Sequence, residues 1–404
     1  MINMSHPRLA VHVVAVSATA FFTQACSDTG NDPVAPAEVV PAMTAAPAQV
    51  ARPAPAPPPV RPDNSDRAGW AAFAYNQWKD LFLTSQGANG GYRVITTDRQ
   101  DGTVSEHTAY GMLFAAYLND RDTFDGLWQF GKSKLNDRGL MAWLVNSSGN
   151  TLDGTAATDA DEDAAIALIA AEKRWGGSYG QDARTLIDNL YNHGVEKPSH
   201  VLKPGDTWGG SDVTNPSYLA PGYYKVYRDY TGRAEWDQVV DASYMVLDNL
   251  GQRSPGAAQT GLVPDWSRAD GGEANGKSYK YTFDACRMPW RLAHDVSWFG
   301  DPRAQAHLDK LNTFFAGLGA ATLKSGYNLD GTVGSGENDR WHNATVVSMA
   351  AAGMSLSTDP ALQSEFFDEL IKVSESSRSY NQSLRLLGIV FSAGLMPNPM
   401  ELTP

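Results

Sequence analysis

Two kinds of helical segment alternate along the chain from about residue 65 onward. In the first kind, apolar residues recur on one stripe while the opposite face stays polar, which is typical of a helix with one face in water. Residues 181–193 follow this pattern, and so do the segments that begin at Asp301-Pro302 and Asp359-Pro360. Both Asp-Pro pairs indicate an N-cap followed by the first helical turn.

The second kind of segment is apolar on nearly every side, so it must be surrounded by protein. Four segments have this character, namely residues 110–118, 164–171, 344–354 and 384–395. Half-exposed and fully buried helices that alternate over about twelve segments predict a large all-α fold, with an inner layer of helices inside an outer layer.

Polar and aromatic residues stand immediately before each buried segment. If these segments form the inner layer of a closed ring with alternating up and down helices, they all begin at the same end of the molecule. We predict the functional site at that end. The residue groups that would meet there are Ser105-Glu106, Thr158-Asp159, Asn215-Pro216, Phe283-Asp284, Trp341-His342-Asn343 and Tyr380-Asn381.

A cluster of acids opens the buried segment at residues 164–171. The helix dipole favours such acids in any protein, so a purely structural role is one interpretation. Their alternating spacing also matches a calcium loop, but that loop requires glycine at its sixth position and glutamate at its twelfth, where this chain has Ala164 and Ala170. We therefore expect neither a metal nor another cofactor. The acids are Asp159, Asp161, Glu162 and Asp163.

Residues 1–25 predict a secretory signal peptide. A weakly basic start precedes an apolar run over residues 9–22, and this run is too short to cross a bilayer. Cys26 follows directly, but Thr23-Gln24-Ala25 is a poor lipobox, so lipid anchoring and ordinary cleavage both stay open. We expect a secreted or cell-surface protein without a membrane-spanning segment.

Residues 26–64 predict a linker, because alanine, proline and valine dominate them and cannot build a core. Residues 65–404 predict a single folded domain, which we expect to be monomeric. Cys286 is the only cysteine in this domain, so we expect no internal disulfide and a small buried side chain there. The net charge of −13 argues against nucleic acid and anionic membranes as partners.

The run at residues 157–175, ATDADEDAAIALIAAEKRW, resembles the signature of glycoside hydrolase family 8. Only Ala164 departs from it, where the family usually carries a larger aliphatic residue. The resemblance implies an (α/α)6 barrel of six inner and six outer helices, and it makes residues 65–404 a catalytic domain. Further blocks that resemble the family spread over nearly all of this domain: SEHTAYGM, LKPGDTWGGSDVTNPSYLAPGYYKVY, GLVPDW, DACRMPWR, DVSWFGDPRA and NQSLRLL.

The resemblance assigns roles to three carboxylates. Glu106, in SEHTAYGM, matches the family's general acid. Asp284, in YTFDACRMPWR, matches the general base, and Arg287 one helical turn later would keep that carboxylate ionised. Asp159 would be a third active-site carboxylate, which supports the acid and hydrogen-bonds sugar hydroxyls.

Sugar rings need flat apolar faces for binding, so aromatic residues in the matching loops are candidates. The predicted substrate-binding residues are Trp143, Trp208, Tyr218, Arg287 and Tyr380.

The chain departs from the family pattern near three of these positions. His107 and Ala109 replace glycines after the general acid, which affects the local backbone. Phe283 replaces a tyrosine before the general base, and residues 375–384 are serine-rich where related enzymes carry several tyrosines.

The resemblance implies an inverting endo-β-1,4-glucanase, a cellulase that hydrolyses β-glucan by general acid and base catalysis. A xylanase or a chitosanase of the same family is the alternative within this class. A non-catalytic glycan-binding protein on the same scaffold is the alternative outside it. Binding alone would not require Glu106, Asp159 and Asp284 together, which argues against that alternative.

Overall fold

The computed structural model describes residues 61–373 and 377–404, and these residues form thirteen α-helices and five short strands. The predicted signal peptide at residues 1–25, Cys26 and the predicted linker as far as residue 60 lie outside the described residues. Among the residues that are described, no helix is both long and apolar enough to span a membrane.

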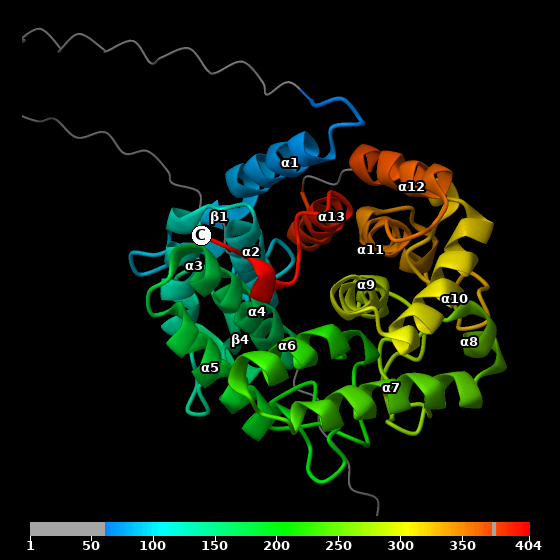
Figure 1. Cartoon of the computed structure of the whole chain (residues 1–404), viewed down its shortest axis with the longest axis horizontal. Helices are drawn as coiled ribbons and strands as arrows, with labels where there is room; N and C mark the ends of the chain where they lie inside the picture. The colour runs from blue at the N-terminus through cyan, green and yellow to red at the C-terminus, as the bar shows by residue number, and fades with distance from the viewer. Residues whose placement is uncertain (1–60, 374–376) are drawn as a thin grey trace, which may run out of the picture. The chain divides into compact units, whose positions relative to one another are not determined.

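Six helices form an inner ring (Figure 1). Within the ring, α2 contacts both α4 and α13, and α9 contacts both α6 and α11. The inner helices are α2 (Ser105–Tyr117), α4 (Thr158–Trp175), α6 (Pro221–Thr231), α9 (Met288–Phe299), α11 (Ala344–Met354) and α13 (Ser379–Ser392).

Six outer helices surround this ring, and each inner helix has one outer helix as its main partner. The pairs are α2 with α3, α4 with α5, α6 with α7, α9 with α10, α11 with α12, and α13 with α1. This arrangement is the (α/α)6 barrel, which confirms the predicted all-α, two-layered fold. The outer helices are α1 (Arg67–Phe82), α3 (Arg121–Lys132), α5 (Tyr179–Asn189), α7 (Trp236–Arg253), α10 (Pro302–Leu318) and α12 (Pro360–Lys372).

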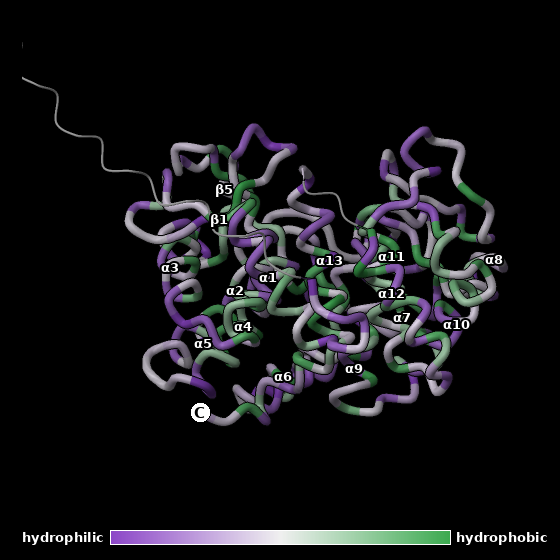
Figure 2. Tube along the Cα trace, turned by 90° about the horizontal axis from the view of Figure 1, so that it is seen from above, coloured by the Kyte–Doolittle hydropathy of each residue, from purple (hydrophilic) through white to green (hydrophobic). Residues whose placement is uncertain are grey.

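The two hydrophobic patterns account for the two layers. Every residue of α11 is buried, whereas the buried residues of α10 are spaced along one stripe. Figure 2 shows apolar and polar colours alternating along the helices, as expected where one face of a helix is buried and the other is in water. The predicted N-caps are confirmed, because the Asp301 and Asp359 side chains each accept a backbone N–H at 2.8 Å. The buried residues of α10 are Ala304, Leu308, Leu311 and Phe315.

Two small antiparallel sheets lie in the connections that lead into the inner helices, and the sequence pattern did not predict them. The strand pairs are β1 (Leu83–Thr84) with β2 (Arg93–Val94), and β3 (Thr103–Val104) with β4 (Ala142–Val145), which also pairs with β5 (Thr151–Ala156). The short helices are α8 (Pro255–Thr260), η1 (Leu190–Gly194), η2 (Pro216–Tyr218), η3 (Ala285–Arg287), η4 (Ala320–Thr322), η5 (Asn338–Arg340) and η6 (Pro399–Glu401).

The barrel closes where α1 packs against α13. The indole N–H of Trp78 on α1 donates to the Ser383 hydroxyl on α13 at 2.9 Å, across 305 positions of sequence. At the same seam, the backbone N–H groups of Thr97 and Ser379 each donate to the other residue's hydroxyl, at 3.1 and 3.2 Å.

Candidate active site

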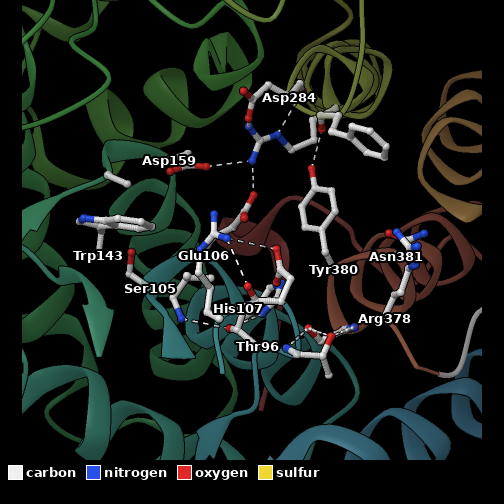
Figure 3. A pocket seen from close by; sticks show the side chains of 18 of the residues that line it. Thr96, Ser105, Glu106, His107, Trp143, Asp159, Asp284, Arg378, Tyr380 and Asn381 are labelled. Carbon is white, nitrogen blue, oxygen red and sulfur yellow. Dashed lines mark hydrogen bonds and ion pairs between the residues drawn. The ribbon is translucent and has the colours of Figure 1, made fainter. Parts of the chain in front are cut away.

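A cleft of about 1020 Å³ opens at the end of the barrel where the inner helices begin (Figure 3). Its lining comes from the starts of α2, α4 and α13, from the turn before α9 and from the loop before α11. The sequence predicted this end of the molecule, since polar residues precede each buried segment.

Two inner helices each have a single residue that is not buried, and this residue shows where the cleft lies. In α2 every residue is buried except Glu106, and in α13 every residue is buried except Tyr380. A helix that is otherwise enclosed shows a single side chain to solvent only if that side chain faces an opening. Both side chains point into the cleft in Figure 3.

The three-stranded sheet positions the first part of the site. β3 leads directly into α2 and so delivers Glu106, while β5 leads into α4 and delivers Asp159. β4 pairs with both and carries Trp143. The sheet therefore brings Glu106, Trp143 and Asp159 to one wall of the cleft.

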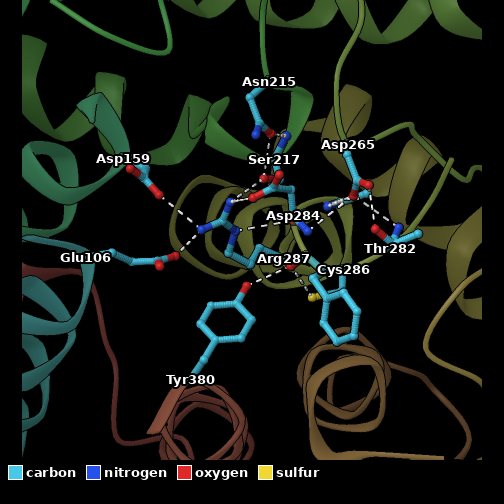
Figure 4. Close-up of polar contacts among 12 residues, drawn as sticks. Glu106, Asp159, Asn215, Ser217, Asp265, Thr282, Asp284, Cys286, Arg287 and Tyr380 are labelled. Carbon is cyan, nitrogen blue, oxygen red and sulfur yellow. Dashed lines mark hydrogen bonds and ion pairs between the residues drawn. The ribbon is translucent and has the colours of Figure 1, made fainter. Parts of the chain in front are cut away.

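Arg287 is the centre of the acid cluster (Figure 4). Its Nη1 donates to Glu106 Oε1 and, at 3.0 Å, to Asp159 Oδ2. Its Nη2 donates at 2.9 Å to Asp284 Oδ1 and at 3.0 Å to the Ser217 hydroxyl. One buried guanidinium thus holds three carboxylates that come from three different inner helices or their leading turns.

The three carboxylates differ in environment. Asp159 is 1% exposed, and burial raises its pKa to about 7 although Arg287 opposes the shift. The Asp284 side chain is 36% exposed and borders the cleft, and partial burial raises its pKa to about 6, again against Arg287. Glu106 also accepts a hydrogen bond from the Tyr110 hydroxyl one helical turn later, at 2.8 Å.

The structure brings most of the predicted site residues together. Glu106, Asp159, Asp284 and Arg287 line the cleft, and the sequence had anticipated the Asp284–Arg287 pair but not the reach of Arg287 to the other two acids. The remaining predicted residues that line it are Trp143, Tyr218 and Tyr380.

Trp208 lies outside the cleft lining and is 40% exposed. Its ring stacks on Trp266 at a centroid distance of 5.7 Å, and Trp266 does line the cleft. Sequence reasoning missed Trp266, although it stands in the matching block GLVPDW. Trp341, which the sequence placed at this end of the molecule without assigning it to the substrate, also lines the cleft, and the Arg378 guanidinium packs on its exposed ring at 5.0 Å.

Two of the acids that follow Asp159 form contacts inside the protein and not in the cleft. Asp161 accepts the backbone N–H of Met141 at 2.9 Å, and Asp163 forms a two-point ion pair with Arg291 at 2.6 and 3.0 Å. Ser105 is the first residue of α2 and not its N-cap. Val104 occupies that position in extended conformation, because β3 runs straight into the helix.

His107, which replaces a family glycine, is accommodated in the wall of the cleft. Its Nδ1 lies 2.8 Å from the Thr96 hydroxyl, and its ring stacks on Tyr380 at 6.2 Å. The Tyr380 hydroxyl in turn donates to the Phe283 carbonyl at 2.7 Å. Within the described ranges, no group of three or more His, Cys, Asp or Glu side chains has the arrangement of a metal site.

Comparison with known proteins places the chain among the glycoside hydrolases. The family model "Glycosyl hydrolases family 8" matches residues 63–394. Endoglucanase A of Acetivibrio thermocellus is 46% identical over 340 residues, which cover 81% of this chain and 69% of the relative. Endoglucanase 2 of Ruminiclostridium josui is 40% identical over 335 residues, which cover 80% of this chain and 71% of the relative.

A solved structure has the same barrel. The apo beta-1,3-1,4-glucanase from Paenibacillus sp. X4 superposes with a TM-score of 0.75 at 25% sequence identity, over 84% of this chain and 94% of that chain. The family model spans most of the folded domain, and the fold agrees with it. This chain belongs to glycosyl hydrolases family 8.

Proposed function

We propose that this protein is an endo-β-1,4-glucanase that cleaves β-glucan chains with inversion at the anomeric carbon. One observation carries the proposal: Arg287 gathers Glu106, Asp159 and Asp284 in an open, aromatic-lined cleft. An open cleft admits the interior of a long polymer, whereas a closed pocket would admit only its end. The two relatives at 46% and 40% identity, both named endoglucanases, support the substrate class.

In this proposal Glu106 is the general acid. It donates its proton to the glycosidic oxygen as the bond from that oxygen to the anomeric carbon breaks. Asp159 supports it, because the raised pKa of about 7 keeps a proton within the cluster near neutral pH. The Asp159 Oδ1 is buried and has no hydrogen-bond partner among the described residues, and Asp159 itself lines the cleft.

Asp284 is the general base. It removes a proton from a water molecule, whose oxygen bonds to the anomeric carbon on the face opposite the departing sugar. Arg287 holds one Asp284 oxygen at 2.9 Å and leaves the carboxylate at the border of the cleft, where water has access. Trp143, Tyr218 and Tyr380 supply apolar faces for the sugar rings on either side.

Inversion makes a stereochemical prediction. An attacking water must fit between Asp284 and the sugar, so the acid and the base should stand about 6.5 to 9.5 Å apart in the bound complex. Proton NMR of a β-linked oligosaccharide, recorded before mutarotation, should show the α-anomer of the product first. Early release of the β-anomer would instead indicate a covalent intermediate and would remove Asp284 from the role of base.

The pKa of Asp284 predicts how kcat/KM changes with pH on the acidic side. Burial raises the pKa of Asp284 to about 6, and a protonated carboxyl cannot accept a proton from water. We expect kcat/KM to fall about tenfold per pH unit below about pH 6, because only the ionised form is active. A profile measured from pH 4 to 8 under subsaturating substrate tests this, and a flat profile down to pH 4 would contradict it.

A panel of polymers tests the substrate class. The purified protein should release reducing ends from soluble cellulose and mixed-linkage β-glucan faster than from xylan or chitosan. Preference for xylan or chitosan would favour the corresponding enzyme of the family. No release from any polymer, together with measurable glycan binding, would favour a non-catalytic binding protein.

The same proposal covers the organisation of the chain. Residues 1–25 direct export, residues 26–64 form a linker and residues 65–404 are the catalytic domain, which acts as a monomer outside the cell or at its surface. Mass spectrometry of the mature protein from the culture distinguishes cleavage without modification from a lipidated Cys26. Retention of the full-length precursor in the cytoplasm would contradict export.

A further inference from the structure

Asp265 is a buried carboxylate that the proposed chemistry does not use. It is 3% exposed, and its Oδ1 accepts three backbone N–H groups, from Thr282 at 3.1 Å, Asp284 at 3.2 Å and Ala285 at 2.9 Å. Figure 4 shows it beside Asp284, on the side away from Glu106. The main chain that carries Asp284 is therefore fixed by a single side chain.

The other carboxylate oxygen of Asp265 accepts two further hydrogen bonds. Its Oδ2 accepts the Ser278 hydroxyl at 2.8 Å and the Thr282 hydroxyl. The backbone N–H of Asp265 itself donates to the Lys280 carbonyl at 2.7 Å. Because an ionised carboxylate only accepts hydrogen bonds, five donors around it indicate a fixed negative charge next to Asp284.

Trp266, the next residue, borders the same cleft as the Asp284 side chain. The only hydrogen-bond donor of its side chain is the indole N–H, and Trp266 lowers the pKa of the Asp284 carboxyl through it. The ring lines the cleft, stacks on Trp208 at 5.7 Å and lies 6.4 Å from the Tyr218 ring. The backbone N–H of Trp266 donates to the Ser278 carbonyl at 3.1 Å, which fixes the residue in turn.

We propose that Asp265 and Trp266 are the positioning residues of the general base: Asp265 fixes the main chain of Asp284, and the Trp266 indole N–H orients its carboxylate. This inference rests on the proposed function, in which Asp284 is the base. When both the main chain and the side chain of the base are held in place, its free carboxylate oxygen stays directed at the attacking water. Neither residue needs to contact the reacting atoms.

The two residues act on Asp284 with opposite electrostatic sign. Burial raises the pKa of Asp284 most and Arg287 lowers it; beyond these, the charge of Asp265 raises that pKa and the indole N–H of Trp266 lowers it. The charged or titratable groups around Asp284 are Arg287, Asp265, Glu106, Tyr218 and Cys286. Substitutions at positions 265 and 266 should therefore move the acidic limb of the pH profile in opposite directions.

The test is the pH dependence of kcat/KM for Asp265→Asn and Trp266→Phe. Asparagine keeps an oxygen for the backbone N–H groups but removes the charge, so the acidic limb should move down by at least about half a pH unit. Phenylalanine keeps an aromatic ring but removes the indole N–H, so the limb should move up. In both variants kcat should fall by about tenfold or more while KM changes by less than about threefold.

Matched controls come from the outer ring. Asp120 is a carboxylate that accepts the backbone N–H and the hydroxyl of Thr123 at 3.1 and 2.9 Å, and the Trp128 indole donates to Asp182 at 2.7 Å. Asp120→Asn and Trp128→Phe repeat the same chemical changes far from the cleft. The acidic limb should stay at its wild-type position in both.

Two outcomes separate this inference from the function on which it rests. Suppose that Asp284→Ala is inactive, but that the acidic limbs of the Asp265→Asn and Trp266→Phe profiles both stay within about 0.2 pH units of wild type. Asp284 is then the base, and the positioning roles are wrong. If Asp284→Ala is active, the assignment of the base is wrong. Should Asp265→Asn not fold, as judged by circular dichroism, Trp266→Phe decides alone: an upward shift supports the proposal, and no shift overturns it.

Discussion

Replacing Glu106 by glutamine is expected to lower kcat on unactivated β-glucan by at least about a hundredfold, since a positioned general acid contributes two to four decades. The amide keeps the shape of the carboxyl group but cannot give its proton to the glycosidic oxygen. The fold should survive, because Glu106 is the one residue of α2 that is not buried. Reducing-sugar release under saturating substrate measures the effect.

A substrate with a better leaving group provides the internal control for this variant. An aryl cellobioside whose phenol leaves without protonation should lose much less rate than the polymer, because that bond breaks without help from an acid. Glu235→Gln, an exposed glutamate at the start of α7, serves as the matched substitution and should leave both rates unchanged. Equal losses on both substrates would point to damage other than the loss of an acid.

Arg287→Met is expected to lower the free energy of unfolding by about 3 to 5 kcal/mol at pH 8, because it leaves buried carboxylates without their counter-charge. Arg287 and Asp159 are each 2% exposed in their side chains, so water cannot replace the lost contact. Activity should fall as well, since the guanidinium holds the acid and the base together. Urea denaturation followed by tryptophan fluorescence measures the stability.

The pH dependence of this loss has a definite sign. Burial already raises the pKa of Asp159 to about 7, above the value of about 4 for an unfolded aspartate, and removing the opposing Arg287 raises it further. A carboxyl whose folded pKa is raised costs stability progressively as the pH increases past the unfolded value. The destabilisation should therefore be smaller at pH 5 than at pH 8.

Arg303→Met is the matched control for that measurement. Arg303 bridges Asp301 and Asp241 at 2.8 Å; the side chains of Arg303 and Asp241 are 43% and 73% exposed, and Asp301 keeps Lys225 as a second cation at 2.7 Å. An exposed ion pair of this kind contributes about 1 kcal/mol or less, and its loss should depend little on pH in this range. A similar cost for both variants would mean that the Arg287 cluster is no more important than a surface pair.

Much of the barrel could be predicted because its two layers leave different hydrophobic patterns. A run such as residues 164–171, without a polar side chain, must be enclosed by protein and therefore belongs to the inner layer. The Asp301-Pro302 pair predicts the start of an outer helix. The two small sheets could not be predicted in this way. Their strands span two to six residues, too few for a period of two to stand out.

The acid cluster shows where sequence reasoning ends. The spacing of Asp284 and Arg287 predicted their contact, because three residues make one helical turn. No local pattern could have connected Arg287 with Glu106, which is 181 positions away, or with Asp159, which is 128 positions away. Asp265 and Trp266 were inside a recognised block, but only the structure shows that Asp265 binds the turn of Asp284 and that Trp266 borders the same cleft.

The seam between α1 and α13 has a consequence for how the barrel is made. The Trp78–Ser383 hydrogen bond spans 305 positions, so the ring cannot close until nearly the whole domain has been synthesised. Such non-local contacts slow folding, because the entropy of a very long loop must be lost before they form. Until α13 arrives, the inward face of α1 is only partly covered: Tyr75 and Trp78 pack against Phe114 of α2, but the Trp78 indole lacks its partner Ser383. Nascent chains that stop short of α13 should therefore expose apolar surface that chaperones and proteases bind. They should also lack the part of the cleft wall that Tyr380 forms.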